Sequence, residues 1–161
     1  MKNVKRRLIN YIFNDLSLED YLQKMLIVGR YSFINDIRER YFEKKIRNKF
    51  SCYINPKAKY GKDIRFPHPV GIVIGEGCNI GNNVTIFQNV TLGAARLGEG
   101  KEGRYPNIED DVTIFAGVVV IGNVIIGKGS TIGANSVVTS SVQPNSVIVG
   151  IPGRCKEAKY E

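Results

Sequence analysis

The chain has 161 residues and a formal net charge of +8, with 43% hydrophobic and 24% charged residues. This length suits one domain of about 100–200 residues, and the ordinary balance of apolar and charged residues excludes a wholly disordered chain. The sequence contains no stretch of 18 uncharged apolar residues, which excludes a transmembrane helix, and its basic start lacks the features of a secretory signal. We therefore expect a cytoplasmic protein.

The cysteines and the single histidine argue against a metal site. Cys52, Cys78 and Cys155 are odd in number and far apart, unlike a disulfide framework or a Cys-x-x-Cys site. A zinc site needs clustered ligands, which one histidine and scattered cysteines do not provide. The stretch GNVIIGKGS resembles a phosphate-binding P-loop, but Gly129 stands where that motif requires serine or threonine. We expect no metal.

Basic residues are concentrated near the N-terminus. Residues 1–50 hold 12 Lys or Arg against 6 Asp or Glu, and residues 51–161 hold 11 against 9. The acids are interleaved with the bases and no recognition motif accompanies them, so we expect no nucleic-acid partner. The basic and apolar run at residues 5–13 either packs on the rest of the protein, the simpler interpretation, or contacts the inner face of the membrane as a peripheral anchor.

The first 50 residues have a helical pattern. Residues 1–53 contain one glycine, Gly29, and five leucines. Apolar residues at helical spacing are Leu18, Tyr21, Leu22, Met25, Ile34, Ile37 and Tyr41. The pattern predicts two or three helices, with Asp15 or Ser17 as N-cap and Gly29 as a stop.

From residue 54 onward, large apolar residues recur at every sixth position in three phased runs. The runs are Ile54, Tyr60, Phe66, Ile72; then Ile74, Ile80, Ile86, Leu92; then Ile108, Ile114, Val120, Ile126, Ile132, Val138. Six residues make one short strand and a turn, so three such units complete a triangular coil whose inward residues stack on the next coil. A small or β-branched residue follows most of these positions four places later. Cys78 follows Ile74 in this way, so it occupies an inward position of the repeat, which favours core packing over a role as a nucleophile.

Two breaks in the repeat indicate where function is concentrated. The phase slips by two residues between Ile72 and Ile74, which indicates an insertion at a corner, and residues 93–107 are rich in glycine and charge, which predicts a projecting loop. His68, the single histidine, lies at the corner where the phase slips. Histidine titrates near neutral pH, so His68 is a candidate general base.

Three segments resemble the serine acetyltransferase branch of the hexapeptide-repeat acyltransferases over about residues 50–155; they read FPHPVGIVIGEGCNIGNNVTIFQNVTLGA, GRYPNIEDDVTIFAGVVVIGNVIIGKGSTIGANSVVTSSV and VIVGIPGR. The resemblance implies a mainly β fold, a left-handed parallel β-helix preceded by a short α-helical segment. It also implies a homotrimer with acetyl-CoA in the groove between neighbouring prisms. We expect a helical segment at 1–50, the β-helix at 51–155 with the loop at 93–107, and a tail at 156–161.

The resemblance assigns chemistry to His68 and Gly93. The histidine that matches His68 is the family's general base, which takes a proton from the acceptor hydroxyl as that hydroxyl attacks the thioester. A backbone N–H near Gly93 matches the family's donor to the tetrahedral oxyanion. We therefore expect both residues to be catalytic.

The resemblance also suggests binding residues. Arg104 and Tyr105 in the loop match positions that bind the acceptor substrate. Ala116 and Ala134 are 18 residues apart, one full coil, and match the edge that contacts CoA. Arg154 matches the end of the family's chain, where it would meet a CoA phosphate.

Three departures from the family pattern bear on the acceptor. Pro67 stands where the family has an aspartate before the histidine, Tyr105 replaces a second histidine, and Tyr53 replaces a carboxylate that pairs with the catalytic histidine. The first two changes remove groups that bind the amino acid, and short relatives with Pro-His-Pro resemble acetyltransferases of surface polysaccharide synthesis. We therefore expect an acetyl-CoA-dependent O-acetyltransferase acting on a sugar hydroxyl of a glycan. Serine O-acetyltransferase is the alternative, an amine acceptor stays open, and the missing carboxylate allows a non-catalytic scaffold.

Overall fold

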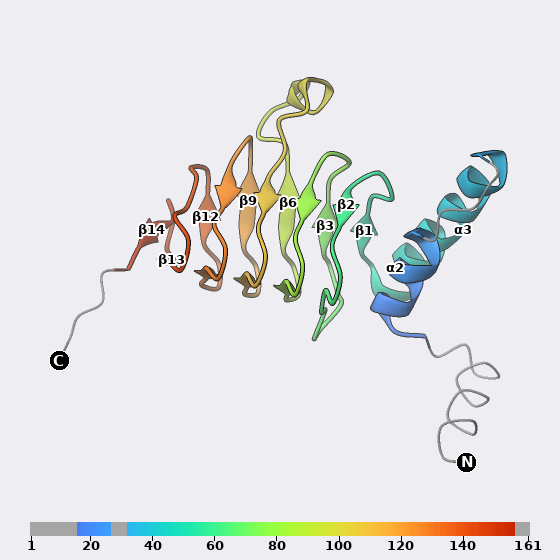
Figure 1. Cartoon of the computed structure of the whole chain (residues 1–161), viewed down its shortest axis with the longest axis horizontal. Helices are drawn as coiled ribbons and strands as arrows, with labels where there is room; N and C mark the ends of the chain where they lie inside the picture. The colour runs from blue at the N-terminus through green and yellow to red at the C-terminus, as the bar shows by residue number, and fades with distance from the viewer. Residues whose placement is uncertain (1–15, 27–31, 157–161) are drawn as a thin grey trace, which may run out of the picture.

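The computed structural model describes residues 16–26 and 32–156. The basic run at 5–13, Asp15, Gly29 and all but the first residue of the tail lie outside these residues. Two described helices, α2 (Leu18–Leu26) and α3 (Ser32–Phe50), precede a parallel β-helix (Figure 1). None of the described helices is long and apolar enough to cross a membrane.

Helix α2 starts at a capping box. The Ser17 hydroxyl accepts a hydrogen bond from the Asp20 N–H at 3.2 Å, and the Asp20 carboxylate accepts one from the Ser17 N–H at 3.0 Å. Of the two predicted caps, Ser17 is confirmed. Leu18, Tyr21 and Leu22 are buried, as their helical spacing predicts.

Helix α3 is present, but its predicted apolar face is only partly correct. Ile37 and Tyr41 are each 55% exposed, so their spacing identified the helix without identifying a core face. The buried side of α3 includes Ile46, which is inaccessible to solvent, and the Phe42 and Phe50 rings pack edge-on against Tyr21 of α2. These contacts hold the two helices together.

The β-helix has three faces. The first face contains β1 (Tyr53–Ile54), β3 (Val73–Ile74), β6 (Thr91–Gly93), β9 (Val119–Ile121) and β12 (Val137–Val138). The second contains β2 (Lys59–Tyr60), β4 (Asn79–Ile80), β7 (Asn107–Ile108) and β10 (Ile125–Ile126), and the third contains β5 (Thr85–Ile86), β8 (Thr113–Ile114), β11 (Thr131–Ile132), β13 (Val147–Val149) and β14 (Arg154–Cys155). All pairs are parallel except β13 with β14, which is antiparallel.

The six-residue period places aliphatic side chains inside the prism. Parallel register puts Ile54 opposite Ile74, Ile74 opposite Leu92, and so on along the first face. The corresponding column on the third face is Ile86, Ile114, Ile132 and Ile148. These residues are at most 4% exposed, and burial of each apolar side chain contributes about 1.5–3 kcal/mol to folding.

Both predicted breaks occur where the sequence places them. Ile72 and Ile74 are both buried, and the corner before them carries the two extra residues. The segment between β6 and β7 leaves the prism and includes a 3-10 helix at Glu99–Glu102 (Figure 1).

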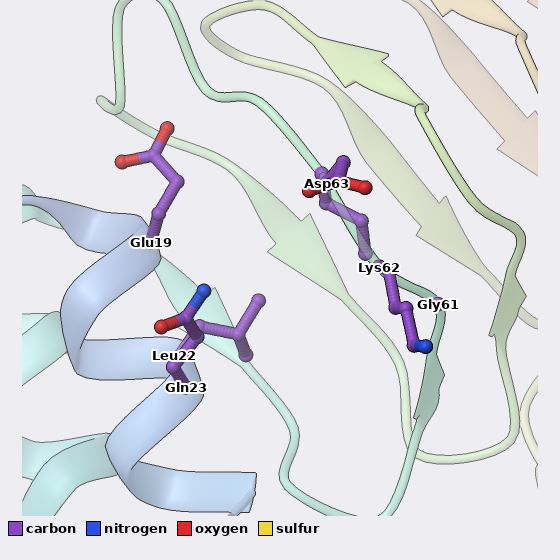
Figure 2. A pocket seen from close by; sticks show the side chains of 7 residues that line it. Glu19, Leu22, Gln23, Gly61, Lys62 and Asp63 are labelled. Carbon is purple, nitrogen blue, oxygen red and sulfur yellow. The ribbon is translucent and has the colours of Figure 1, made fainter.

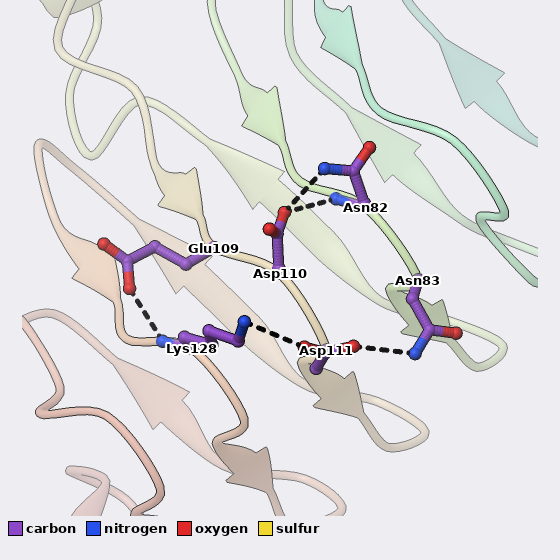
Figure 3. Close-up of polar contacts among 6 residues, drawn as sticks. All are labelled: Asn82, Asn83, Glu109, Asp110, Asp111 and Lys128. Atoms are coloured by element: carbon purple, nitrogen blue, oxygen red, sulfur yellow. Dashed lines mark hydrogen bonds and ion pairs between the residues drawn. The ribbon is translucent and has the colours of Figure 1, made fainter.

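Asparagine and aspartate side chains connect the coils at the corner between the second and third faces (Figure 3). Asp110 Oδ1 accepts hydrogen bonds from the backbone N–H of Asn82 at 2.7 Å and from its side-chain amide at 3.0 Å. Asp111 accepts one from Asn83 at 2.8 Å and pairs with Lys128 at 3.5 Å. The Asn83 hydrogen bond, with help from Lys128, holds the pKa of the Asp111 carboxyl below its usual value.

Cys78 lies inside the core, as its repeat position predicts. Its side chain is inaccessible to solvent and its Sγ donates to the Leu92 carbonyl at 3.4 Å. Burial raises the pKa of the Cys78 thiol to about 11 and also raises the pKa of Cys52, whereas Cys155 is exposed.

Thiol reactivity should follow this difference in burial. At pH 8, well below the raised pKa of Cys78, the buried thiols stay protonated and out of reach of reagent. We expect Ellman's reagent to modify Cys155 alone in the native protein and all three cysteines in denaturant. Rapid modification of Cys155→Ser protein under native conditions would contradict the burial of the other two.

Neighbouring isoleucines on β10 provide a matched test of the stacked core. Ile126 is fully buried and Ile125 is 46% exposed on the opposite side of the same strand. We expect Ile126→Ala to lower the free energy of unfolding by about 2–5 kcal/mol and Ile125→Ala by less than about 1 kcal/mol, measured by chemical denaturation. Equal losses would show that the inward column does not carry the stability.

Candidate active site

His68 lies on the edge where the third face turns into the first. We call residues 67–72, 87–90, 115–118 and 133–136, the successive corners at this turn, the His68 edge. His68 is exposed, and its ring centroid lies 6.2 Å from that of Phe87. Phe87 stacks on Phe115 at 5.0 Å with an interplanar angle of 17°. The imidazole is thus the first of three rings that follow the edge from coil to coil.

Ala116 and Ala134 continue the same edge beyond Phe115. The N–H of Asn135 donates to the Ala116 carbonyl at 2.9 Å, which places the two alanines on adjacent coils. Gly117 has a φ of +70°, a backbone conformation that favours glycine. A Cβ at this position would also overlap the Asn135 Oδ1, so the close approach of Asn135 requires glycine as well. Small side chains therefore occupy the edge where the sequence predicts contact with CoA.

Arg154 lies past the last coil, at the end of the His68 edge opposite to His68. It pairs with Val149 through the antiparallel β13 and β14, and its side chain is exposed. This position leaves the guanidinium available to an anionic group.

Gly93 and the loop lie at the other end of the first face. First-face strands begin at the His68 edge, and Gly93 is the last residue of β6, so one chain does not bring Gly93 beside His68. The same applies to Arg104, which pairs within the loop with Glu102 at 3.0 Å and Glu99 at 3.8 Å. Residues that the resemblance groups into one site thus come from two edges of the prism.

Gly93 has an unusually open position. Its φ is not in the left-handed region, and a Cβ added there would meet no other heavy atom within 4 Å in the part of the chain that the structure describes. Its carbonyl accepts the N–H of Gly122 at 2.9 Å. Neither backbone conformation nor packing within the chain requires glycine here, so the bare backbone is available to something outside it.

Tyr105 occupies a cradle of glycines. A Cβ on Gly77 would overlap its ring, one on Gly75 would lie 2.8 Å from its Cε1, and one on Gly100 would lie 2.6 Å from its hydroxyl oxygen. The ring is partly buried against the core and anchors the base of the loop. Binding of substrate by Tyr105 stays a prediction, and the two glycines of the turn were missed because the sequence suggested no partner for them.

Tyr53, which replaces the family's carboxylate, is 41% exposed, and the Arg47 guanidinium lies 5.6 Å from its ring centroid. A different carboxylate approaches the corner that bears His68, because Glu19 Oε1 accepts the backbone N–H of Phe66 at 2.7 Å. Sequence reasoning missed Glu19, which lies 47 residues away in the chain.

Two further observations concern polar atoms. The side-chain oxygen of Gln88, on the His68 edge, is buried with no hydrogen-bond partner among the described residues. Such an atom costs free energy unless another molecule supplies a donor. No group of three or more His, Cys, Asp or Glu within residues 16–26 and 32–156 could hold a metal ion.

Comparisons with known proteins agree with this geometry. The family described as bacterial transferase hexapeptide (six repeats) matches residues 105–140. A curated serine acetyltransferase from Bacillus licheniformis is 52% identical over 101 residues, which is 63% of this chain and 46% of that protein. Residues 105–140 thus match the hexapeptide-repeat family, and about 100 residues of the chain are similar to a serine acetyltransferase.

Solved structures support the same conclusion. A serine acetyltransferase in complex with CoA aligns with a TM-score of 0.67 and 38% identity, and the soybean serine acetyltransferase complexed with serine aligns with a TM-score of 0.69 and 40% identity. Each alignment covers 77% of this chain and 51% of the other. The expected fold, a left-handed β-helix, is confirmed, and the chain spans about half the length of these relatives.

The glycine cradle can be tested by filling it. We expect Gly77→Ala to displace Tyr105, to lower the free energy of unfolding by about 1–3 kcal/mol, and to speed trypsin cleavage at Lys101 and Arg104. Gly93→Ala is the matched control, because the added methyl group meets open space and should change neither quantity. Similar effects from the two variants would refute the anchoring contact.

Proposed function

We propose that the chain is an acetyl-CoA-dependent O-acetyltransferase and that L-serine is its acceptor. The observation that carries this proposal is the 52% identity to a named serine acetyltransferase over 101 residues. Similar structures bound to CoA and to serine add support. The comparisons favour serine, the alternative in the sequence analysis, over the sugar hydroxyl that Pro67 and Tyr105 suggested.

His68 is suited to act as the general base. Its imidazole is exposed on the edge, where it accepts the proton of the serine hydroxyl as the oxygen attacks the thioester carbonyl carbon. The tetrahedral intermediate collapses with breakage of the carbon–sulfur bond, and the imidazolium returns the proton to the CoA thiolate. The products are O-acetylserine and CoA, and His68 is regenerated.

The remaining site residues are assigned to a neighbouring copy. Gly93 and Arg104 lie at the opposite edge from His68, so we propose a homotrimer in which the loop edge of one chain faces the His68 edge of the next. The bare backbone of Gly93 then offers its N–H to the oxyanion. Arg104, whose side chain is about half exposed, exchanges its pairs with Glu99 and Glu102 for the acceptor carboxylate.

CoA is assigned to the His68 edge. The Phe87 and Phe115 rings offer an apolar surface to the pantetheine arm, Ala116 and Ala134 let the arm approach the backbone, and Arg154 pairs with a phosphate.

The deciding experiment is CoA release from acetyl-CoA with L-serine as acceptor. Removal of a general base costs about 10²–10⁴-fold, so we expect His68→Ala and the polar His68→Asn to lower kcat by that factor with an unchanged fold. Turnover that persists in both variants would refute the assignment of His68. Acetyl-CoA binding without turnover on any acceptor would favour a scaffold.

A sugar hydroxyl is the second candidate acceptor. Pro67 beside His68 and the Tyr105 ring inside its glycine cradle leave two positions without the charged groups that would bind an amino acid. The same assay with nucleotide sugars in place of serine distinguishes the two acceptors. Turnover on a nucleotide sugar, with none on serine, would favour the second candidate.

A further inference from the structure

The first coil has an unusual hydrogen bond at the strand segment before His68. In the next coil, the N–H of Ile86 donates to the Arg65 carbonyl of the coil before it, at 2.9 Å. Phe66 is the equivalent residue of the first coil, because Arg65 pairs with Thr85. No earlier coil precedes Phe66 in the β-helix, and its N–H donates to Glu19 Oε1 at 2.7 Å. The Glu19 carboxylate thus takes the place of the missing carbonyl.

Glu19 is itself held firmly by α2. It lies in the first turn of the helix, inside the capping box formed by Ser17 and Asp20. Leu18 and Leu22, on either side of it, are at most 5% exposed and belong to the same core as the first coil. The carboxylate therefore has a defined position relative to the β-helix.

A cavity separates α2 from the turn of the first coil. Its volume is about 350 Å³, with Glu19, Leu22 and Gln23 on the helix side and residues 61–64 on the other (Figure 2). Since no side chain in the described part of the chain fills this space, packing among those residues does not by itself hold the helix to the turn here. The hydrogen bond from Phe66 to Glu19 supplies a fixed connection at this point.

Three consecutive residues, Phe66, Pro67 and His68, link the hydrogen bond to Glu19 with the imidazole of the candidate base. The Phe66 side chain is 3% exposed and fixed in the core, Pro67 has a restricted φ, and the His68 carbonyl accepts the N–H of Val70 at 2.9 Å. A rotation of the Phe66 peptide would therefore be passed on to the imidazole. None of these three residues is a glycine, so none has the backbone freedom that would absorb such a rotation.

We propose that Glu19 is a positioning residue for His68, acting through the Phe66 N–H to hold the corner from which the imidazole projects. This inference rests on the proposed function of His68. It assigns to the helical segment a part in the reaction, because α2 delivers the carboxylate. Glu19 touches neither substrate nor reacting atoms in this scheme.

The imidazole signals of His68 report the effect directly, because the chain contains one histidine. The experiment uses the full chain without a histidine tag and compares Glu19→Ala, Glu19→Gln and Ser17→Ala by NMR, thermal unfolding and the CoA-release assay. Glutamine keeps a side-chain oxygen that can accept the Phe66 N–H. Ser17→Ala is the matched control, because it weakens the start of the same helix without removing the Phe66 contact.

We expect Glu19→Ala to shift and broaden the His68 signals and to lower kcat by about 10- to 100-fold, with KM changed less than about twofold. Glu19→Gln should restore both the signals and kcat. Ser17→Ala should lower the unfolding temperature while leaving the His68 signals in place.

Unchanged His68 signals in Glu19→Ala, or equal changes in Ser17→Ala, would overturn the proposal. The NMR readout needs no turnover, so it separates this inference from the proposed function. A wild-type chain that acetylates no acceptor, yet whose His68 signals move in Glu19→Ala and return in Glu19→Gln, would refute the activity and support the positioning.

Discussion

The vertical stacking of aliphatic side chains is the interaction on which the structure depends. Each strand is two or three residues long, too short to persist alone, so a strand is stable only where inward residues such as Ile86 and Ile114 contact each other across coils. Parallel register fixes the height of every coil relative to its neighbours. The corners, which carry the candidate site residues, take their spacing from that register.

The shared register of the coils explains why the rings and the small residues follow one edge in order. His68, Phe87 and Phe115 belong to successive corners, and Ala116 and Ala134 continue the line. Such a linear edge would suit the long, flexible thioester of the proposed reaction better than a closed pocket would. The loop occupies the opposite edge, so the prism separates His68, the proposed base, from the residues proposed to recognise the acceptor.

The sequence predicted most of the prism because two side chains in every six, such as Val84 and Ile86, meet a single environment, the dry interior. It predicted the place of His68 through the slip in that period. Contacts that cross the repeat were missed: Glu19 meets Phe66 across 47 residues, and Tyr105 meets Gly77 only after the loop has left and rejoined the coil. Ile37 shows the limit of helical spacing, since the pattern does not reveal whether a partner covers the face. In the proposed function, recognition of the acceptor depends on loop side chains and on a neighbouring copy, and the six-residue period encodes neither.

The two ends of the prism are closed in different ways. Helices α2 and α3 cover the first coil, where Glu19 accepts the backbone N–H of Phe66 (Figure 1). At the far end, β14 pairs antiparallel with β13. A bare end of a parallel β-helix presents open strand edges to the matching end of another molecule, which is a route to fibrils. Because helices cover one end and the third face ends in an antiparallel strand at the other, a second prism cannot continue the parallel ladder of that face. This reversal works against growth of the repeat into an endless filament.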